Sequence, residues 1–404
     1  MKRIALSYIL LVLAAALCFG VSLIIQRALI PEINAAPQVS ISENTQYLSV
    51  TPTAMFGTDG VSIGYANGLV YLAYDDGLYE CDTESDVCTN IYENAKGLSC
   101  ICPYGGYIYA VYLEYITGKT IYEGYEVYHI IKIDYNTHES TTLYTAEQGR
   151  EIRCMAMTAQ GEMYFIERDG YDVSKSFVPQ QGFLYSLREG GRPQKLTAAD
   201  WYYIDDRRLY ITRYNAGDDT EKLFISDIGC YDKLTDTGLA VGRNISENGG
   251  VMFSPAGDSI YYTDDNYDLC RYDIKSGNSE KIFGFEGDRL IYYFAVFDER
   301  MILLVREQMK DERWCYVLYY LDEDNKPVKI TDDITLNQGQ KYMFEWIECM
   351  AMFSGDDVFL LATYDPNIEN KVYVIDKDFQ MHLVAQSGEW DYEAYEMMKD
   401  GMSG

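Results

Sequence analysis

The residues of this chain that could carry out chemistry are mostly carboxylates. The sequence has 63 Asp and Glu residues against 33 Lys and Arg residues, and only three histidines. Two carboxylates of different protonation state perform the acid and base steps of glycoside hydrolysis. Acidic residues are so numerous here, however, that no pair stands out by its spacing. We therefore predict no catalytic residue, and a glycan-active enzyme that uses carboxylates at the mouth of a central opening stays an alternative.

Motifs for nucleophilic or metal chemistry are weak. The run Gly60–Gly64 matches G-x-S-x-G, but a turn and a strand follow it, whereas a nucleophile elbow requires a helix. The histidines His129, His138 and His382 have no metal-ligand spacing and no defined partner. The run Asp264–Asp268 has the D-x-N-x-D spacing of a calcium loop but lacks its following glycine, so we interpret it as a polar hairpin tip. We predict no metal and no cofactor.

Two of the ten cysteines are placed to form a disulfide. Cys81 and Cys88 flank a short polar stretch that reads as a hairpin turn, so their side chains can face each other across two strands. We predict that they are bridged. Cys100, Cys154 and Cys349 stand in small-residue stretches that suit the crowded centre of a ring of strands. A thiol site at that centre is the alternative interpretation.

A repeating pattern of strands and turns must position these residues. Gly249–Asn278 contains three short strands, each ended by a turn such as Pro255–Asp258. The pattern recurs roughly every 40 to 55 residues, which is the period of four-stranded propeller blades. Its reference position is an aromatic or apolar residue of the second strand: Tyr71, Tyr109, Tyr164, Tyr210, Tyr261, Leu303 and Phe359. The sequence predicts an all-β fold over residues 46–388, a β-propeller of seven four-stranded blades, with a strand at 46–50 that pairs with the last repeat.

The third strand of most repeats is expected to end in an aspartate that accepts backbone N–H groups in the following turn: Asp82, Asp134, Asp227, Asp273, Asp322 and Asp376. The distance from the reference residue to this aspartate varies. If strands vary little in length, the additional residues lie in the loop between the second and third strands. Such loops share one face of a propeller, and insertions on one face often mark a binding surface.

The longest of these loops are predicted in repeats two to four, at Glu114–Gly124, Asp169–Gln181 and Asn215–Glu221. Their aromatic side chains could stack on sugars or anchor a protein partner, or could pack against neighbouring loops. The candidate residues for a ligand or partner are Tyr115, Tyr122, Tyr125, Tyr171, Phe177, Asp218 and Asp219.

The N-terminal segment predicts a membrane anchor. Ile4–Ile25 is a nearly uninterrupted apolar run that follows two basic residues, and at ~1.5 Å per residue it can cross a hydrocarbon core of ~30 Å. The run is longer than a signal-peptide core, and Pro37 follows the best small-residue site. We predict an uncleaved transmembrane signal-anchor at 4–25, with a cytoplasmic tip at 1–3, a linker at 26–45 and a C-terminal tail at 389–404. The propeller would then lie outside the cell.

The formal net charge of −30 argues against binding to nucleic acid, because an acidic surface repels phosphates. We expect a protein or a glycan of the cell envelope as the partner, and contact with the membrane only through the N-terminal helix.

Two stretches resemble known propellers. Tyr261–Asp264, YYTD, differs in one residue from the YWTD signature of the low-density-lipoprotein-receptor type. Phe253–Gly257, FSPAG, followed by Ile260–Tyr262, resembles the FSPDG turn and strand of the TolB-like propellers. Less crisp forms extend the resemblance over about residues 50 to 387. The resemblance implies a scaffold for binding or interaction and carries over no catalytic residue. On this basis we expect a non-enzymatic binding module; a structural component of the cell envelope is a further alternative.

Overall fold

The computed structural model describes eight stretches of the chain: residues 47–48, 62–116, 125–169, 182–243, 253–308, 314–330, 346–364 and 371–386, apart from positions 67, 75–76, 84–86, 94, 96, 159, 206, 288, 298–299, 354–357 and 377 within them. The chain divides into two compact units, Met1–Ser40 and Ile41–Gly404, and every described residue belongs to the second. The predicted anchor, the linker and the C-terminal tail all lie outside the described residues.

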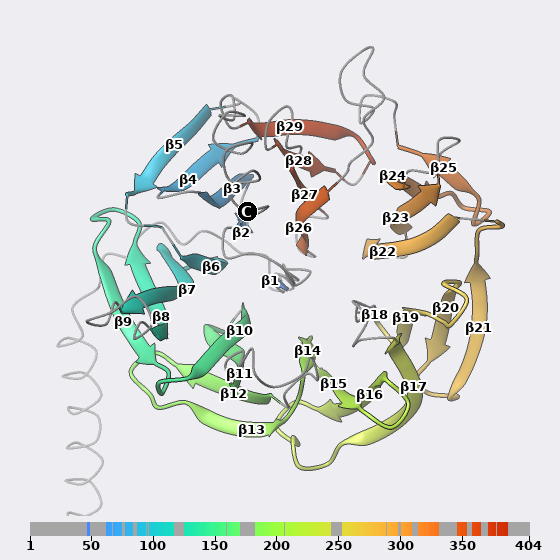
Figure 1. The fold of residues 1–404 in the computed structure, drawn as a ribbon, viewed down its shortest axis with the longest axis horizontal. Coiled ribbons are helices and arrows are strands. Elements are labelled where there is room, and N and C mark those ends of the chain that lie inside the picture. The colour runs from blue at the N-terminus through green and yellow to red at the C-terminus, as the bar shows by residue number, and fades with distance from the viewer. Residues whose placement is uncertain are drawn as a thin grey trace, which may run out of the picture. The chain divides into compact units, whose positions relative to one another are not determined.

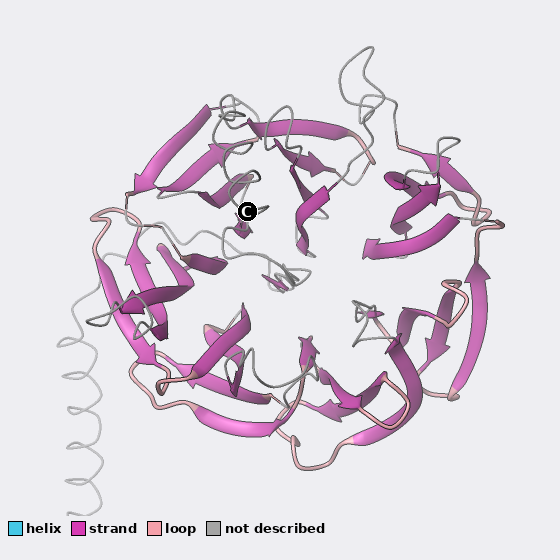
Figure 2. Ribbon diagram, in the orientation of Figure 1, coloured by secondary structure: helices cyan, strands magenta, loops and turns pink. Residues whose placement is uncertain are grey.

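Every described element of the second unit is a strand (Figure 2). The first is β1 (Tyr47–Leu48), and four-strand repeats follow it in the chain. Repeat one contains β2 (Ser62–Ala66), β3 (Leu69–Tyr74), β4 (Gly77–Asp82) and β5 (Val87–Tyr92). Repeat two contains β6 (Leu98–Tyr104), β7 (Tyr107–Ile116), β8 (Tyr125–Asp134) and β9 (Ser140–Thr145). Repeat three contains β10 (Arg150–Met157), β11 (Glu162–Asp169), β12 (Phe183–Arg188) and β13 (Gln194–Ala198).

The later repeats have the same order. Repeat four contains β14 (Trp201–Ile204), β15 (Arg208–Asn215), β16 (Thr220–Asp227) and β17 (Thr235–Arg243). Repeat five contains β18 (Phe253–Ala256), β19 (Ser259–Thr263), β20 (Leu269–Asp273) and β21 (Asn278–Phe283). Repeat six contains β22 (Arg289–Phe297), β23 (Arg300–Gln308), β24 (Trp314–Leu321) and β25 (Pro327–Lys329). Repeat seven contains β26 (Trp346–Phe353), β27 (Val358–Tyr364), β28 (Lys371–Ile375) and β29 (Met381–Gln386).

The repeats form antiparallel sheets arranged in a ring, with the first strand of each repeat nearest the centre and the fourth at the rim (Figure 1). This arrangement is a β-propeller. The reference positions predicted from the sequence all fall in second strands, because each repeat places the same apolar residue against its neighbour. Tyr164 and Tyr210, for example, are buried.

The expectation of seven separate blades is wrong. Strand pairing among the described residues gives six sheets, five of four strands and one of nine. The two-residue strand β1 causes the difference, because Tyr47 pairs with Met157 of β10 and also with Phe353 of β26. Repeats three and seven are thereby fused into one sheet in the order β13-β12-β11-β10-β1-β26-β27-β28-β29. The predicted N-terminal strand does pair with the last repeat. It pairs with the innermost strand of that repeat, β26, and also with β10 of repeat three.

The hydrophobic core lies between neighbouring sheets. Separate buried clusters join repeat one to two, two to three, three to four, four to five, and five to six. The cluster between repeats three and four contains Tyr164, Ile166, Tyr202 and Ile211, whose side chains point across the interface. Alternation along each strand therefore sends one set of side chains to the preceding repeat and the other to the following repeat.

The turn-capping role of the third-strand aspartates is confirmed at four positions. Each carboxylate accepts backbone N–H groups of the turn that follows: Asp134 from Asn136 and Thr137 at 2.9 Å, Asp273 from Ser276 at 2.7 Å, Asp322 from Asp324 and Lys326 at 2.9 and 2.8 Å, and Asp376 from Asp378 and Gln380 at 2.9 Å. These hydrogen bonds favour the ionised carboxylate and lower the pKa of Asp134 and Asp273.

The assumption that strands vary little in length is wrong. β7 and β8 have ten residues each, whereas β3 and β4 have six. In repeat four, β15 and β16 continue to Asn215 and from Thr220, so the predicted long loop is a short turn between long strands. Part of what the sequence spacing assigned to loops is therefore additional strand.

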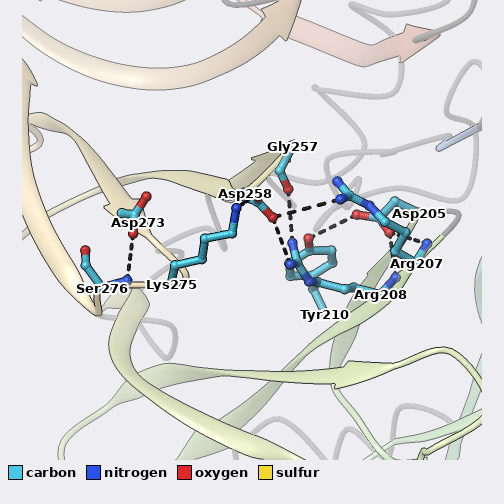
Figure 3. A network of polar contacts seen from close by, with 9 residues as sticks. All are labelled: Asp205, Arg207, Arg208, Tyr210, Gly257, Asp258, Asp273, Lys275 and Ser276. Carbon is cyan, nitrogen blue, oxygen red and sulfur yellow. Dashed lines mark hydrogen bonds and ion pairs between the residues drawn. The ribbon is translucent and has the colours of Figure 1, made fainter.

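A polar network joins repeats four and five at the ends of the strands where the first and second strands meet (Figure 3). Asp258 accepts a hydrogen bond from Arg208 at 2.9 Å and lies 2.5 Å from Nζ of Lys275. Asp205 accepts backbone N–H groups of Arg207 and Arg208 at 2.8 and 2.6 Å. Contacts with Lys275 and Arg208 lower the pKa of Asp258 to about 2.

Among the residues the structure describes, none belongs to a helix long and apolar enough to cross a membrane.

Candidate active site

A cluster of buried and half-buried charged residues lies at the opposite end of the strands, in repeats three and four. This end carries the connections between second and third strands, as the sequence predicts for a binding face. We call the group the carboxylate–arginine cluster; its members are Glu151, Arg153, Arg168, Asp200, Arg213 and Glu221.

Glu151 is held between two arginines. It lies in β10 directly opposite Arg168 of β11, and Arg153 follows two residues later on the same side of the sheet. Arg168 Nε donates to Glu151 Oε2 at 3.1 Å, and Arg153 Nε contacts Glu151 Oε1. The carboxylate is buried, whereas the side chains of Arg153 and Arg168 retain 31% and 25% of their exposure. Two cations thus share one anion, and both cations reach the surface.

Asp200 is fixed by backbone donors just before β14. Its Oδ2 accepts the N–H of Tyr214 at 2.7 Å, and its Oδ1 accepts the N–H of Gly182 at 3.1 Å. Burial raises the pKa of Asp200, and the hydrogen bonds and the charges of Arg168 and Arg213 oppose that rise. Asp200 therefore connects the two repeats, because Gly182 comes from repeat three and Tyr214 from repeat four.

Gly182 is the residue that allows this approach. A Cβ at this position would lie 2.7 Å from the backbone oxygen of Ala199 and 2.7 Å from Cγ2 of Ile166. Only glycine fits between these two groups, so the N–H that reaches Asp200 depends on the missing side chain.

Glu221 is the second residue of β16 and is 3% exposed. Its Oε2 has no hydrogen-bond partner among the described residues, and neither does the buried hydroxyl of Thr212. Burial, and then the charge of Asp200, raise the pKa of Glu221 to about 8. At neutral pH Glu221 is therefore a protonated acid beside a carboxylate that backbone N–H groups hold in place. Environments that separate two carboxyl groups in this way are typical of an acid–base pair.

Arg213 completes the cluster on the side of repeat three. Its Nε donates to the Ala198 carbonyl and its terminal nitrogen to Thr197 Oγ1, both at 3.0 Å, and its guanidinium lies over the ring of Phe224. These contacts immobilise the cation at the outer edge of the site.

On the other side of the β10–β11 hairpin, one arginine contacts two carboxylates, whereas in the cluster two arginines contact one carboxylate. Arg150 donates to Glu167 Oε1 at 3.1 Å and also contacts Asp169, so one cation serves two carboxylates. Tyr144 of repeat two donates its hydroxyl to Glu167 Oε2 at 2.6 Å. The contact between Tyr144 and Glu167 joins repeats two and three.

Of the candidate residues named from the sequence, the described Tyr115 and Tyr125 do not come together. Tyr115 is 57% exposed and Tyr125 is 38% exposed, but Tyr115 pairs with Glu126, the residue after Tyr125, so the two rings lie on opposite sides of the β7–β8 hairpin. Tyr122, Tyr171 and Phe177 lie outside the described residues. Asp218 accepts from the hydroxyl of Thr220 at 2.6 Å, and Asp219 accepts from the hydroxyl of Tyr214 at 2.8 Å.

The described cysteine side chains comprise a bridged pair and five free thiols, of which Cys100, Cys102 and Cys270 are buried. Cys81 and Cys88 lie opposite each other in β4 and β5 and form a disulfide. Cys100 and Cys154 occupy bulges of the inner strands β6 and β10 with positive φ. Burial raises the pKa of both thiols, to about 12 for Cys154. Such thiols stay protonated at neutral pH, so they are poor nucleophiles and the thiol-site alternative finds no support.

Other motifs noted in the sequence have structural partners. Asp264 accepts the backbone N–H groups of Asn266 and Asp268 at 2.9 and 3.0 Å, which is the polar hairpin tip expected there. Ser62 opens β2, and β3 rather than a helix follows. His129 bridges Thr145 and Glu114 across three strands, at 2.9 and 3.1 Å. Within the described part of the chain, no group of three or more His, Cys, Asp or Glu residues is placed to hold a metal.

The sequence did contain a signal for the missed cluster. In β10 the charged residues Glu151 and Arg153 alternate with buried Ile152 and with the small residues that follow. A charged pair on an inward-facing side of a strand is unusual, because burying it costs free energy unless partners are close. Asp200 and Glu221 carry no comparable signal.

Comparison with known proteins gives the fold. No family model and no curated protein matches the chain. Among solved structures, the chain is similar to the β-propeller domain of the Trilobed protease from Pyrococcus furiosus, at 12% identity and a TM-score of 0.51, covering 82% of this chain and 100% of that one. It is also similar to an oligogalacturonate lyase from Vibrio parahaemolyticus, at 10% identity and a TM-score of 0.50, covering 83% and 98%.

A third similar structure comes from a study of two prolyl endopeptidases, at 11% identity and a TM-score of 0.53. The match covers 81% of this chain and 50% of that one, so the chain spans about half the length of the endopeptidase. These likenesses show a β-propeller and nothing finer. The resemblance to the YWTD and TolB-like propellers stays a prediction.

The expectation of a non-enzymatic module is corrected by the same comparisons. The similar structures are enzymes or parts of enzymes, so this fold is not a sign that catalysis is absent. The inference from the fold to a mere interaction scaffold was therefore wrong. Function has to be argued from the site itself, and the carboxylate–arginine cluster is the site that the described residues provide.

Proposed function

We propose that this protein is a glycan-active enzyme whose acid–base pair is Glu221 and Asp200. The observation that carries the proposal is the buried Glu221 with an unpartnered Oε2, beside an Asp200 that is fixed by two backbone N–H groups. Cleavage of a glycosidic bond needs one carboxyl group that donates a proton to the leaving oxygen and a second carboxyl group that stays ionised.

The roles follow from the two environments. Burial and the charge of Asp200 disfavour the ionised form of Glu221 more than the nearby hydroxyl of Thr212 favours it, so Glu221 supplies the proton. Asp200 accepts two hydrogen bonds and lies near the charges of Arg168 and Arg213, so it is the carboxylate that acts as base or stabilises positive charge. The similarity to an oligogalacturonate lyase agrees with a glycan as substrate.

The test is turnover of a panel of neutral, acidic and sulfated oligosaccharides by the protein and by two variants. We expect Glu221→Gln to lower kcat roughly 10²- to 10⁴-fold, because the proton donor is lost while the shape is kept. Glu162→Gln is the matched control, since Glu162 lies at the other end of β11 in an ion pair with Arg188. Wild-type activity should fall as pH rises through about 8. Folded protein that turns over no member of the panel would overturn the proposal.

A further inference from the structure

We propose that the substrate of this site carries a carboxylate and that Arg153 and Arg168 bind it, which makes the substrate an acidic glycan built from uronic acids. The inference rests on the proposed function and names its substrate class. The geometry that points to it is the sharing of one buried carboxylate, Glu151, by two arginines that are partly exposed at the same end of the strands as Asp200.

The charge balance of this group is the first argument. Glu151 neutralises one of the two guanidinium groups, so the group keeps a net charge of +1. Asp200 adds a negative charge near Arg168, and Arg213 adds a positive charge near Asp200, so the carboxylate–arginine cluster as a whole also has a net charge of +1 while Glu221 is protonated. In a chain of formal net charge −30, a fixed cationic group at a site is unexpected unless an anion is to be bound there.

The charged group on the other side of the same hairpin supplies an internal comparison. There Arg150 meets Glu167 and Asp169, so the structural requirement of joining two repeats is met with one cation and two anions. If Glu151 needed only a counter-ion, one arginine would likewise be enough. The second arginine makes sense when a further carboxylate arrives from outside.

Arginine is also the suitable residue for this role. Its planar guanidinium has five N–H donors, which match a carboxylate in a bidentate arrangement. In Arg153 and Arg168 the contact with Glu151 is made through Nε. Glu151 therefore orients both guanidinium groups and leaves their terminal nitrogens as the part directed to a ligand. Because Arg168 also acts on Asp200, a bound carboxylate would lie beside the acid–base pair.

A matched pair of substrates isolates the carboxylate. Kinetics are measured with trigalacturonic acid and with its methyl ester, which keeps the shape and removes the charge, using wild-type protein, Arg153→Gln and Arg168→Gln. We expect Arg153→Gln to raise KM for the free acid roughly 10- to 100-fold, as for the loss of a charged hydrogen bond, and to change the ester little. Arg188→Gln is the control, because Arg188 is exposed and distant from the cluster.

A binding measurement separates this inference from the proposed function. Calorimetric titration of galacturonic acid into the Glu221→Gln variant measures binding without turnover. In this background, Arg153→Gln should lower the affinity for galacturonic acid, and Arg153→Lys should lower it less. Preference of the wild-type enzyme for the ester, or for neutral or sulfated glycans, would overturn the inference and leave the glycan-active enzyme intact. Galacturonate binding that needs Arg153, without turnover of any glycan, would support the carboxylate subsite and overturn the enzyme.

Discussion

At neutral pH, Glu221 should make the folded protein less stable than a protein with a side chain of the same shape that cannot ionise. The pKa of Glu221 is about 8 in the folded chain against an ordinary value of 4.5, so the unfolded chain releases this proton at a lower pH than the folded chain does. Below pH 4.5 the group is protonated in both states and contributes nothing. Between pH 4.5 and about 8 the folded state becomes progressively less stable, because only the unfolded chain gains the free energy of ionisation.

The magnitude follows from the linkage. At pH 7 the difference of about 2.5 units from the ordinary value, at ~1.36 kcal/mol per unit, gives a penalty of about 3 kcal/mol. Glutamine has nearly the same shape and cannot ionise, so Glu221→Gln removes the penalty. For a unit of this size we expect a rise in Tm of about 4 °C at pH 7. At pH 4 the variant and the wild-type protein should melt together.

The assay is thermal and urea unfolding of the two proteins at pH 4, 5.5 and 7, with Glu162→Gln as the control for loss of a carboxylate that is in an ion pair. A difference that is the same at all three pH values, or a variant that is less stable at pH 7, would refute the reasoning, because neither result is compatible with a pKa of Glu221 that is raised in the folded protein. Stabilisation together with loss of turnover is the behaviour expected of a catalytic acid, since active sites retain residues that cost stability.

Three further predictions concern the scaffold. Gly182→Ala should destabilise the protein by about 1–3 kcal/mol in urea unfolding, because its Cβ meets a backbone oxygen at 2.7 Å; Gly217→Ala, whose nearest contact is at 3.4 Å, should have a much smaller effect. Asp258→Asn should lower Tm near pH 6, and the difference should shrink as pH falls from about 4 to about 2, where the wild-type carboxylate also becomes protonated; a difference that persists at pH 2 would contradict this. Replacing Cys81 and Cys88 by serine should cost about 2.5 kcal/mol, as the closure of a short loop predicts, and equal stability of the reduced and oxidised proteins would count against it.

The parts of the fold that the sequence predicts are those that depend on local pattern. Tyr164 and Tyr210 could be assigned to second strands because an apolar position recurs after a turn, and Asp322 and Asp376 could be assigned to turns because a carboxylate caps N–H groups near it in the chain. The number of sheets could not be predicted, because it depends on two residues, Tyr47 and Leu48, that pair with partners far away in the sequence.

The candidate site shows the same limit. Glu151 and Arg153 lie two residues apart in one strand, so their shared side could be inferred from alternation. Asp200 and Glu221 meet only because the chain returns through β15 and places Tyr214 opposite Glu221. Among 63 acidic residues, no local property distinguishes these two from aspartates that cap turns. The aromatic candidates were chosen because they lie on or beside long insertions, and the position of an insertion does not say which side of a hairpin a ring occupies.

The pairing of β1 with two distant strands also determines when the nine-stranded sheet can be completed during synthesis. One partner of Tyr47, Met157, leaves the ribosome long before the other, Phe353. At ~5–20 residues per second the interval between them is roughly 10 to 40 s. For that time a nascent chain holds a five-stranded sheet with one open edge at its centre, a surface that another strand can join. Pairing with β26 of the last repeat therefore covers the open edge of β1. A chain truncated before β26 would keep that edge unpaired and available to a strand of another molecule.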